Sequence, residues 1–460
     1  MTSWPDGWER PRSVGEDLLV PLVGGEAARY VNLDHAASTP ALETVWVQVE
    51  HFLPWYSSVH RGTGLKSKVA TAAYEGSRQA LRQFLGARPE DAVVFTRNTT
   101  DAINMLARCL PQGTMVIGTR AEHHANLLPW RQLRSVELPV PRSPAELLDR
   151  LETALKGRRA DGEVLVVVTG ASNVTGEVWP LLAISALAHR HGARVFVDAA
   201  QLAPHRPVEM AALGLDWVAV SGHKLYAPFG CGALVGRRDW LEGAGPYLLG
   251  GGAVEAVSED DVSWAALPGR HEGGSPNVIG AIALASACRY FSGLDRERAI
   301  AHDRLQSSVL QGALEGAHGV EVYRTWGAEV DRVPVRAFGV PGYRPAEVAA
   351  MLSAEHGIGV RSGSFCAHPL LAHLAKSHRG VPSGCGGTIA GAVRASVGVT
   401  SGADEIERLA CALERLVREG PRWSYRSLPD GSVEPDPDDR PQPELLLGFS
   451  GLSALDRVAS

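Results

Sequence analysis

The chain has 460 residues, of which 45% are hydrophobic and 21% charged, and its formal net charge is −6 at neutral pH. This length suits about two domains, and the composition is ordinary for a soluble globular protein. Basic residues form no long run, no segment approaches the ~18 consecutive apolar residues of a membrane span, and the N-terminus lacks a signal-peptide pattern, which argues against nucleic-acid or membrane partners and predicts a cytoplasmic protein.

The first half of the chain alternates between helical patterns and short apolar segments typical of strands. An amphipathic helix is expected over residues 66–85, and Asn98 or Thr99 is expected to cap a helix that ends near Cys109. Further helices are expected over 145–155 and 181–191, and strands over 92–96, 114–118, 163–169, 194–198, 217–221 and 232–235. This alternation predicts a mostly parallel sheet with helices on both faces and ligands at the carboxyl ends of its strands.

Near residue 290 the pattern changes to that of a smaller α+β domain. We expect helices over 278–291, 300–314, 346–356 and 403–417, with strands over 320–323 and 335–338. Beyond Pro421 the chain is rich in Pro, Asp and Arg, which predicts a poorly ordered linker. The predicted division is an N-terminal segment that packs on the small domain (1–29), a large domain (30–292), the small domain (293–424) and a tail (425–460).

The cysteines are widely spaced and include no CxxC pair. We therefore expect neither a disulfide framework nor a metal site. In a reducing compartment each cysteine is by default a small apolar residue, so only its surroundings can argue for reactivity. The six are Cys109, Cys231, Cys288, Cys366, Cys385 and Cys411.

Four features of the large domain have chemical potential. Lys224 follows a buried strand, where the cost of burying its charge would favour a neutral, nucleophilic amine, although alone it also fits a surface loop. Asp198 ends another strand and could pair with a pyridinium nitrogen or simply cap the next turn. The helix start at Thr99 and Thr100 would bind a phosphate or serve as an ordinary N-cap, and His123 could stack on a ring or be merely structural.

The order and spacing of these features resemble the cysteine desulfurases of the class V aminotransferase family, most strongly the Suf-type group, from about residue 30 to residue 416. The matching stretches are VNLDHAASTP (31–40), SVHRGTG (58–64), TRNTTDAIN (96–104), AEHHANLLPW (121–130), ASNVTGEVWP (171–180), VDAAQ (197–201), SGHKLYAPFG (221–230), GGSPN (273–277) and VRASVG (393–398). The resemblance implies pyridoxal 5'-phosphate (PLP) fold type I, with a large domain built on a mostly parallel seven-stranded sheet and a smaller α+β domain.

The resemblance also implies how the cofactor is held. Lys224 would carry PLP as a Schiff base, His123 would stack on its ring, and Asp198 would lie under the pyridine nitrogen. Further contacts would come from Thr99, Thr100, Ser221 and His223 at the phosphate, from Asn173 and Gln201 near the phenolic oxygen, and from Ser275 of a partner subunit. A homodimer is therefore expected.

The substrate and the reaction are inferred in the same way. Arg394 would bind the carboxylate of an amino acid, in the resembling enzymes L-cysteine, while Lys224 moves its α-proton. Cys366 falls where those enzymes carry the cysteine that attacks the substrate's sulfur, releasing alanine and leaving a persulfide for an acceptor protein. Other residues expected on the substrate side are Asn173, His60, Arg361 and Ala36.

The stretch around Cys366 also departs from the family's pattern. Suf-type enzymes usually carry two histidines directly before this cysteine, whereas this chain has Ser364 and Phe365. Either a proton donor near the persulfide is missing, or His60 or His123 serves in its place. Cys385 in PSGCGGT is either a second working thiol or a plain loop cysteine. The alternatives are a PLP-dependent C–S lyase, epimerase or aminotransferase on the same scaffold, and a non-catalytic partner of a sulfur carrier.

Overall fold

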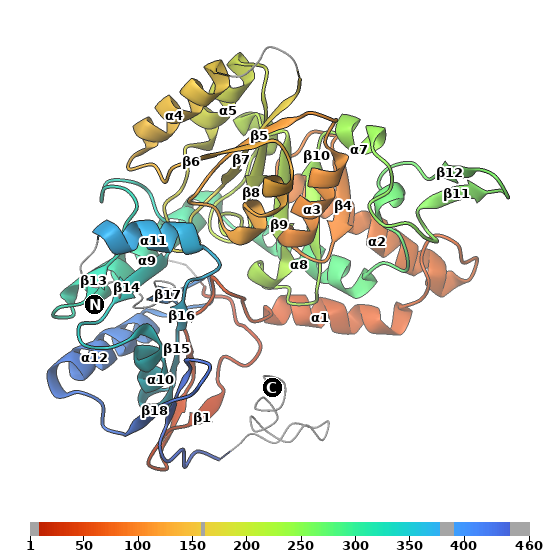
Figure 1. Ribbon diagram of the computed structural model, residues 1–460. Coiled ribbons are helices and arrows are strands. Elements are labelled where there is room, and N and C mark those ends of the chain that lie inside the picture. Colours follow the sequence, from red (N-terminus) through yellow and green to blue (C-terminus); the bar gives the residue numbers. More distant parts are fainter. Residues whose placement is uncertain (1–8, 158–161, 378–390, 442–460) are drawn as a thin grey trace.

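The structure is a computed structural model that describes residues 9–157, 162–377 and 391–441 (Figure 1). Its larger part is built on a seven-stranded sheet with the order β4-β10-β9-β8-β7-β5-β6. Only β10 runs antiparallel to its neighbours, so the predicted mostly parallel sheet is confirmed. The strands are β4 (Ala92–Thr96), β5 (Met115–Thr119), β6 (Ser135–Leu138), β7 (Val164–Thr169), β8 (Arg194–Asp198), β9 (Trp217–Ser221) and β10 (Gly232–Gly236).

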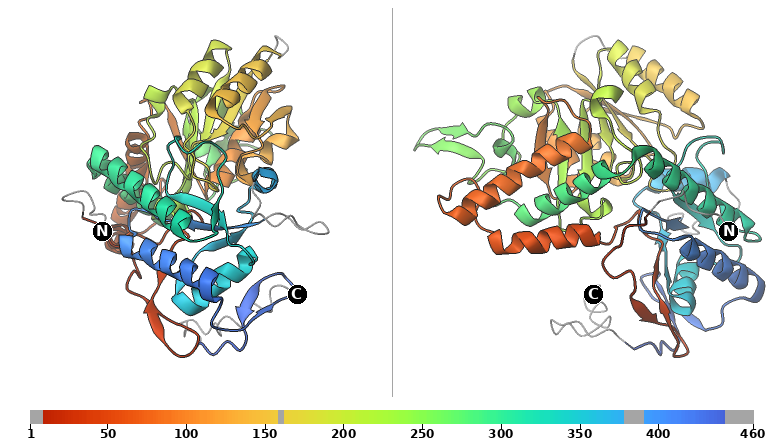
Figure 2. Two further views of the ribbon diagram at one scale, coloured as in Figure 1. Left: turned by 90° about the vertical axis from the view of Figure 1, so that its left-hand side faces the viewer. Right: turned by 180° about the vertical axis from the view of Figure 1, so that it is seen from behind.

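Successive side chains of these strands pack alternately into two separate apolar cores, one on each face of the sheet. Val93 of β4 packs in one core, whereas its neighbour Val94 packs in the other, as expected for strands buried on both faces. The first face is covered by α2 (Leu65–Phe84), α4 (Pro144–Lys156), α5 (Leu181–Arg190) and α8 (Val278–Gly293), and the second by α3 (Thr99–Cys109) and α7 (Asp239–Gly243). The short α6 (Met210–Leu213) adds Met210 to the first core, and α1 (Glu43–Phe52) packs on α8. The hairpin of β11 (Val254–Val257) and β12 (Val262–Trp264) projects from the molecule (Figure 2).

The smaller part contains a four-stranded sheet with the order β13-β14-β17-β16 and its own apolar core. Two strands from near the N-terminus, β1 (Leu19–Pro21) and β2 (Ala27–Arg29), lie against it, because the amide of Val23 donates to the carbonyl of Ala354 at 3.0 Å and β3 (Val31–Asn32) pairs with β15 (Ile358–Gly359). The domain bounds themselves stay a prediction. The remaining elements are α9 (Arg296–Gly316), β13 (Glu321–Val322), β14 (Val335–Gly339), α10 (Pro345–His356), β16 (Arg361–Gly363), α11 (His368–Ser377), β17 (Ala392–Ser396) and α12 (Ala403–Glu419).

The segment after Pro421 corrects one prediction. Instead of a poorly ordered linker, residues 422–441 include the hairpin of β18 (Tyr425–Ser427) and β19 (Val433–Pro435). The hydroxyl of Tyr425 donates to Glu355 on α10 at 2.9 Å, and the indole N–H of Trp423 donates to the carbonyl of Pro437 at 2.7 Å. These two aromatic residues tie down a segment whose overall composition resembles that of disordered chains. Residues 442–460, with the apolar end of the tail, lie outside the described residues.

None of the described helices is by itself long and apolar enough to cross a membrane. The adjacent helices α8 and α9 pass that test only as a pair, bent by 98°.

Candidate active site

A cavity of about 420 Å³ lies at the junction of the two parts of the molecule. The large part contributes residues at the carboxyl ends of its parallel strands, among them Asp198 after β8 and Lys224 after β9. The small part contributes Arg361, Cys366 and Arg394. Loop residues at this edge of an open α/β sheet are free to meet a ligand, which is the usual location of its site.

The cavity brings together most of the site residues predicted from the sequence. It is lined by Ala36, Thr99, Thr100, His123, Asn173, Asp198, Gln201, Ser221, His223, Lys224, Arg361, Cys366 and Arg394. His60 and Ser275 do not line it. The His60 ring instead contacts Glu75, with 2.9 Å between Nε2 and Oε1, and the neighbours of Ser275 line a different hollow beside Tyr74.

Lys224 ends a short 3-10 turn, Gly222–Lys224, that directly follows β9. Removal from water lowers the pKa of its amine to about 8, although the nearby carboxylate of Asp198 acts in the opposite direction. A much larger fraction of this amine is therefore neutral at pH 7 than in an ordinary lysine. A neutral amine is the form that can attack an aldehyde carbon.

Asp198 and His123 line the same cavity, and each has a hydrogen bond from a backbone amide and a pKa that is shifted by burial. The Asp198 carboxylate accepts a hydrogen bond from the amide of Ala200 at 3.0 Å, and burial raises its pKa. Nδ1 of His123 accepts from the amide of Ala125 at 3.0 Å, and burial, together with the charge of Lys224, lowers its pKa to about 3. His123 is therefore a neutral ring with its proton on Nε2, suited to lie against a flat ligand.

The N-terminus of α3 forms the end of the cavity that suits an anion. Asn98 caps the helix, because its side chain accepts from the amide of Asp101 at 3.0 Å. The amide of Thr99 donates to the hydroxyl of Ser221 at 3.2 Å, and the pKa of His223 is lowered to about 4 by burial. Free N–H groups and the helix dipole at such an end favour a phosphate.

Three buried polar atoms around this cavity have no hydrogen-bond partner within the described part of the chain: the Thr99 hydroxyl, the Gln201 side-chain oxygen and Nε of Arg394. Orphaned polar atoms are costly in a folded protein unless a ligand or water serves them. Thr99 lies at the helix end suited to a phosphate, Gln201 near the residues around Asp198, and Arg394 where a carboxylate would bind. The set fits PLP with an amino acid beside it.

Arg394, on β17, is held by contacts that the sequence did not predict. Its Nη2 donates to Asp34 at 2.9 Å, its Nη1 donates to the carbonyl of Asn173 at 3.0 Å, and its guanidinium lies 4.9 Å from the ring centre of Phe365. Burial lowers the pKa of Arg394 and Asp34 opposes that shift. Asp34 and Phe365 are thus site residues that were missed, although a charged residue directly after the apolar pair Val31 and Leu33 was a signal for Asp34.

Cys366 is exposed and lies on a tight turn between β16 and α11. Phe365 and Cys366 both have φ of +52°, a left-handed conformation that is rare for such residues and often marks a functional site. Two hydrogen bonds hold the turn. Asn173 Nδ2 donates to the carbonyl of Phe365 at 2.9 Å, and the backbone amide of His124 donates to the carbonyl of Cys366 at 2.7 Å. His368 lies edge-on to His124 with 4.4 Å between ring centres, and Arg361 lies 3.8 Å from Asp34.

Cys366 also lines a second hollow of about 810 Å³, which runs along α3 and the segment 128–133. Among the cysteines that the structure describes, only Cys366 lines either space. Burial raises the pKa of Cys109, Cys231 and Cys288, which favours the inert thiol. Cys385 lies outside the described residues.

Comparison with known proteins places these features in a family. Residues 31–409 match the family described as aminotransferase class-V. A probable cysteine desulfurase of Vibrio cholerae is 34% identical over 411 residues, covering 87% of this chain and 96% of that protein. A cysteine desulfurase of Klebsiella pneumoniae is 36% identical over 405 residues, covering 86% and 94%.

Solved structures give the same result for the fold. A cysteine desulfurase of Thermococcus onnurineus, determined in its apo form, superposes with a TM-score of 0.75 at 32% identity, covering 85% of this chain and 95% of that one. One from Escherichia coli has a TM-score of 0.72 at 32% identity, covering 84% and 94%. The fold, the ordered cavity residues and these similarities lead to one conclusion: this chain belongs to the class-V aminotransferase family of PLP-dependent enzymes of fold type I.

Proposed function

We propose that this protein is a cysteine desulfurase, which takes the sulfur from L-cysteine as a persulfide on Cys366 and releases alanine. The observation that carries the proposal is that the exposed thiol of Cys366 lines the same cavity as Lys224 and Arg394. A thiol facing the amine and the arginine is what sulfur transfer requires, whereas transamination has no use for it. The curated relatives named as cysteine desulfurases support this choice.

The binding residues set the orientation of the substrate. Arg394 presents an unused Nε and is kept in place by Asp34 and Asn173, so it would bind the substrate's carboxylate through charged hydrogen bonds. With the carboxylate fixed in the cavity that Lys224 and Cys366 also line, the Cα–H would face the amine and the sulfur would face the thiol. This arrangement supplies the proximity that a two-group reaction otherwise lacks in solution.

Lys224 and Asp198 carry the acid–base work. PLP, which Lys224 and Asp198 would hold, would supply an electron-withdrawing ring that stabilises negative charge at the substrate's α-carbon. The amine of Lys224, with its pKa lowered to about 8, can accept and return a proton near neutral pH. Asp198 would hold a proton at the ring nitrogen, and His123 is neutral and so adds no repelling charge beside it.

The sulfur step balances with the groups present. The thiolate of Cys366 attacks the sulfur of L-cysteine, forming an S–S bond as the C–S bond breaks. The electron pair of the C–S bond stays with the β-carbon, which takes up a proton and becomes the methyl group of alanine. Cys366 is left as a persulfide, from which an acceptor thiol removes the terminal sulfur.

The test compares wild type with Cys366→Ala, measuring alanine and protein persulfide formed from L-cysteine in the presence of a reductant. We expect the variant to keep the absorbance of the bound cofactor but to lose both products. Cys411→Ala is the matched control, because Cys411 is an exposed cysteine on α12 and does not line the cavity. Full turnover in Cys366→Ala would refute the thiol mechanism, and pyruvate with ammonia in place of alanine would identify a C–S lyase.

We also propose that the working form is a homodimer. His60 was expected on the substrate side and Ser275 at the phosphate of a partner subunit, and neither lines the cavity of its own chain. Several large apolar side chains directly after α1, at the start of α2 and before the β11–β12 hairpin are exposed, as expected for a covered interface. They are Leu53, Trp55, Tyr56, Leu65, Leu248 and Leu249.

A further inference from the structure

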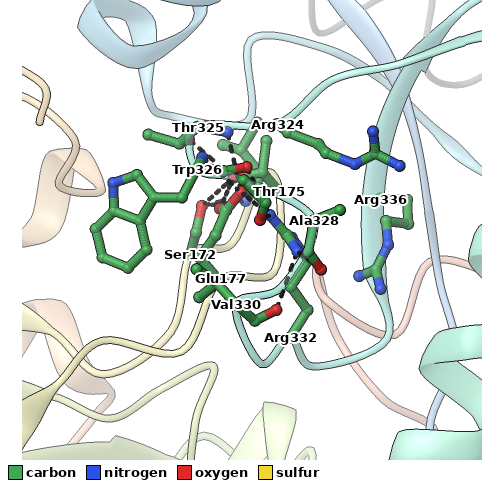
Figure 3. Close-up of polar contacts among 12 residues, drawn as sticks. Ser172, Thr175, Glu177, Arg324, Thr325, Trp326, Ala328, Val330, Arg332 and Arg336 are labelled. Atoms are coloured by element: carbon green, nitrogen blue, oxygen red, sulfur yellow. Dashed lines mark hydrogen bonds and ion pairs between the residues drawn. The ribbon is translucent and has the colours of Figure 1, made fainter. Parts of the chain in front are cut away.

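A buried polar cluster lies where the loop after β7 meets the loop between β13 and β14 (Figure 3). Its centre is Glu177, whose side chain is 1% exposed. One carboxylate oxygen accepts from the amide of Thr325 at 2.9 Å and from Nη2 of Arg332 at 3.4 Å. The carboxylate thus joins a turn of the large part to a loop of the small part.

The same carboxylate also organises its own turn. Its other oxygen accepts from the hydroxyl of Thr175, which lies 3.1 Å from the hydroxyl of Ser172. The Ser172 hydroxyl in turn accepts from the amides of Val174 and Thr175, both at 3.2 Å. Buried side chains with several satisfied hydrogen bonds fix a backbone in one conformation.

The turn is also packed too tightly to shift. Gly176 has φ of +81°, and a Cβ at this position would lie 2.6 Å from the carbonyl oxygens of both Val333 and Val335. Only glycine permits this close approach. The turn 172–177 is therefore held on one side by the network and on the other by the backbone of Val333 and of Val335, the first residue of β14.

The residue at the tip of this turn is Asn173, which contacts both reactive ends of the cavity. Its carbonyl accepts from Nη1 of Arg394 at 3.0 Å, and its side-chain amide donates to the carbonyl of Phe365 at 2.9 Å. Cys366 follows Phe365 in the strained turn. A displacement of Asn173 would therefore move the carboxylate-binding arginine and the thiol together.

We propose that Glu177 and Thr175 are positioning residues that set the distance between Arg394 and Cys366 through Asn173. The proposal rests on the proposed function for its meaning, since it concerns how one substrate is presented to one thiol. Its physical content is independent of turnover: without the network, the turn at residues 364–367 loosens and the affinity of Arg394 for a carboxylate falls. Neither Glu177 nor Thr175 lines the cavity.

The test uses Thr175→Val, which keeps the shape of the side chain but removes the bridging hydroxyl, and Glu177→Gln, which removes the charge that faces Arg332. Thr175→Ser, which retains the hydroxyl, should behave like the wild type in both readouts. Two readouts apply to the full-length protein: hydrogen exchange of residues 363–368 followed by mass spectrometry, and binding of L-alanine to the PLP-loaded enzyme followed by cofactor absorbance. L-alanine has the carboxylate and the amine but no sulfur, so it binds at Arg394 and at the cofactor without any sulfur transfer.

We expect Thr175→Val and Glu177→Gln to speed exchange in 363–368 and to weaken L-alanine binding by about tenfold, as small displacements of positioned groups do. Asp303→Asn is the control for a loss of stability alone, because Asp303 is buried, pairs with Arg206 and does not line the cavity. If both variants lose stability as Asp303→Asn does, but keep wild-type exchange and L-alanine affinity, the proposal is wrong. A wild type that forms no alanine from L-cysteine would refute the function and leave these two readouts to judge the network.

Discussion

At the scale of single residues, the lowered pKa of Lys224 makes a measurable prediction. In the folded apo-protein its amine loses its proton near pH 8, whereas an ordinary lysine does so near pH 10.5. Reductive methylation of Lys224, followed by mass spectrometry, should therefore reach half its maximal rate near pH 8, well below the surface lysines. A profile for Lys224 that coincides with theirs would contradict the assignment.

The same shift has a consequence for stability. Between pH 8 and 10.5 the unfolded chain binds a proton that the folded chain has released, so the free energy of unfolding should rise with pH across this window. A Lys224→Met variant lacks this group and should lack that part of the rise. Urea unfolding of both apo-proteins at several pH values measures the difference, and equal slopes would rule the linkage out.

Sequence reasoning at this scale found residues that follow strands and missed residues defined by a partner far along the chain. Lys224 and Asp198 could be predicted because a charged side chain directly after an apolar strand is visible locally. The pairing of Asp34 with Arg394 joins residues 360 positions apart, and no local pattern encodes it. The contact of Asn173 with Phe365 needed the turn between β16 and α11 to be placed in space.

At the scale of elements, the cap of α3 links stability to anion binding. Asn98→Ala removes the side chain that accepts from the Asp101 amide, and such a loss costs about 1 kcal/mol. We expect Asn98→Ala to lower both the free energy of unfolding and the affinity for PLP, since Asn98 lines the cavity. Ser143→Ala, at the equivalent cap of α4, should lower stability alone. Urea unfolding and equilibrium dialysis separate the two effects.

The same scale shows where pattern reading succeeds. The central strands and helices lie within a few residues of their predicted bounds, because continuous apolar strands and amphipathic helices have clear periodicities. The hairpin of β18 and β19 was missed because it is held by specific contacts, of Tyr425 with Glu355 on α10 and of Trp423 with the carbonyl of Pro437. Amino-acid composition describes the average polarity of a segment, so it cannot predict two specific hydrogen bonds of this kind.

At the scale of the whole molecule, the proposed dimer predicts complementation between two inactive variants. Lys224→Ala should be inactive, and Ser275→Asp should place a negative charge against the partner's phosphate. In a mixed dimer one site carries both defects, whereas the other has Lys224 intact and receives a normal Ser275. Co-expression with two affinity tags isolates this species, and desulfurase activity should return in it. A mixed dimer without activity would mean that each site is built from one chain.

The position of Cys366 between two hollows has a consequence for the routes by which L-cysteine and the sulfur acceptor reach the thiol. One hollow contains the amine and the arginine, and the other opens along α3. We therefore expect L-cysteine to bind on one side of the thiol and the sulfur acceptor to approach from the other. A bound acceptor protein would then not block the cavity that binds L-cysteine. A saturating concentration of acceptor should raise turnover without raising the apparent KM for L-cysteine.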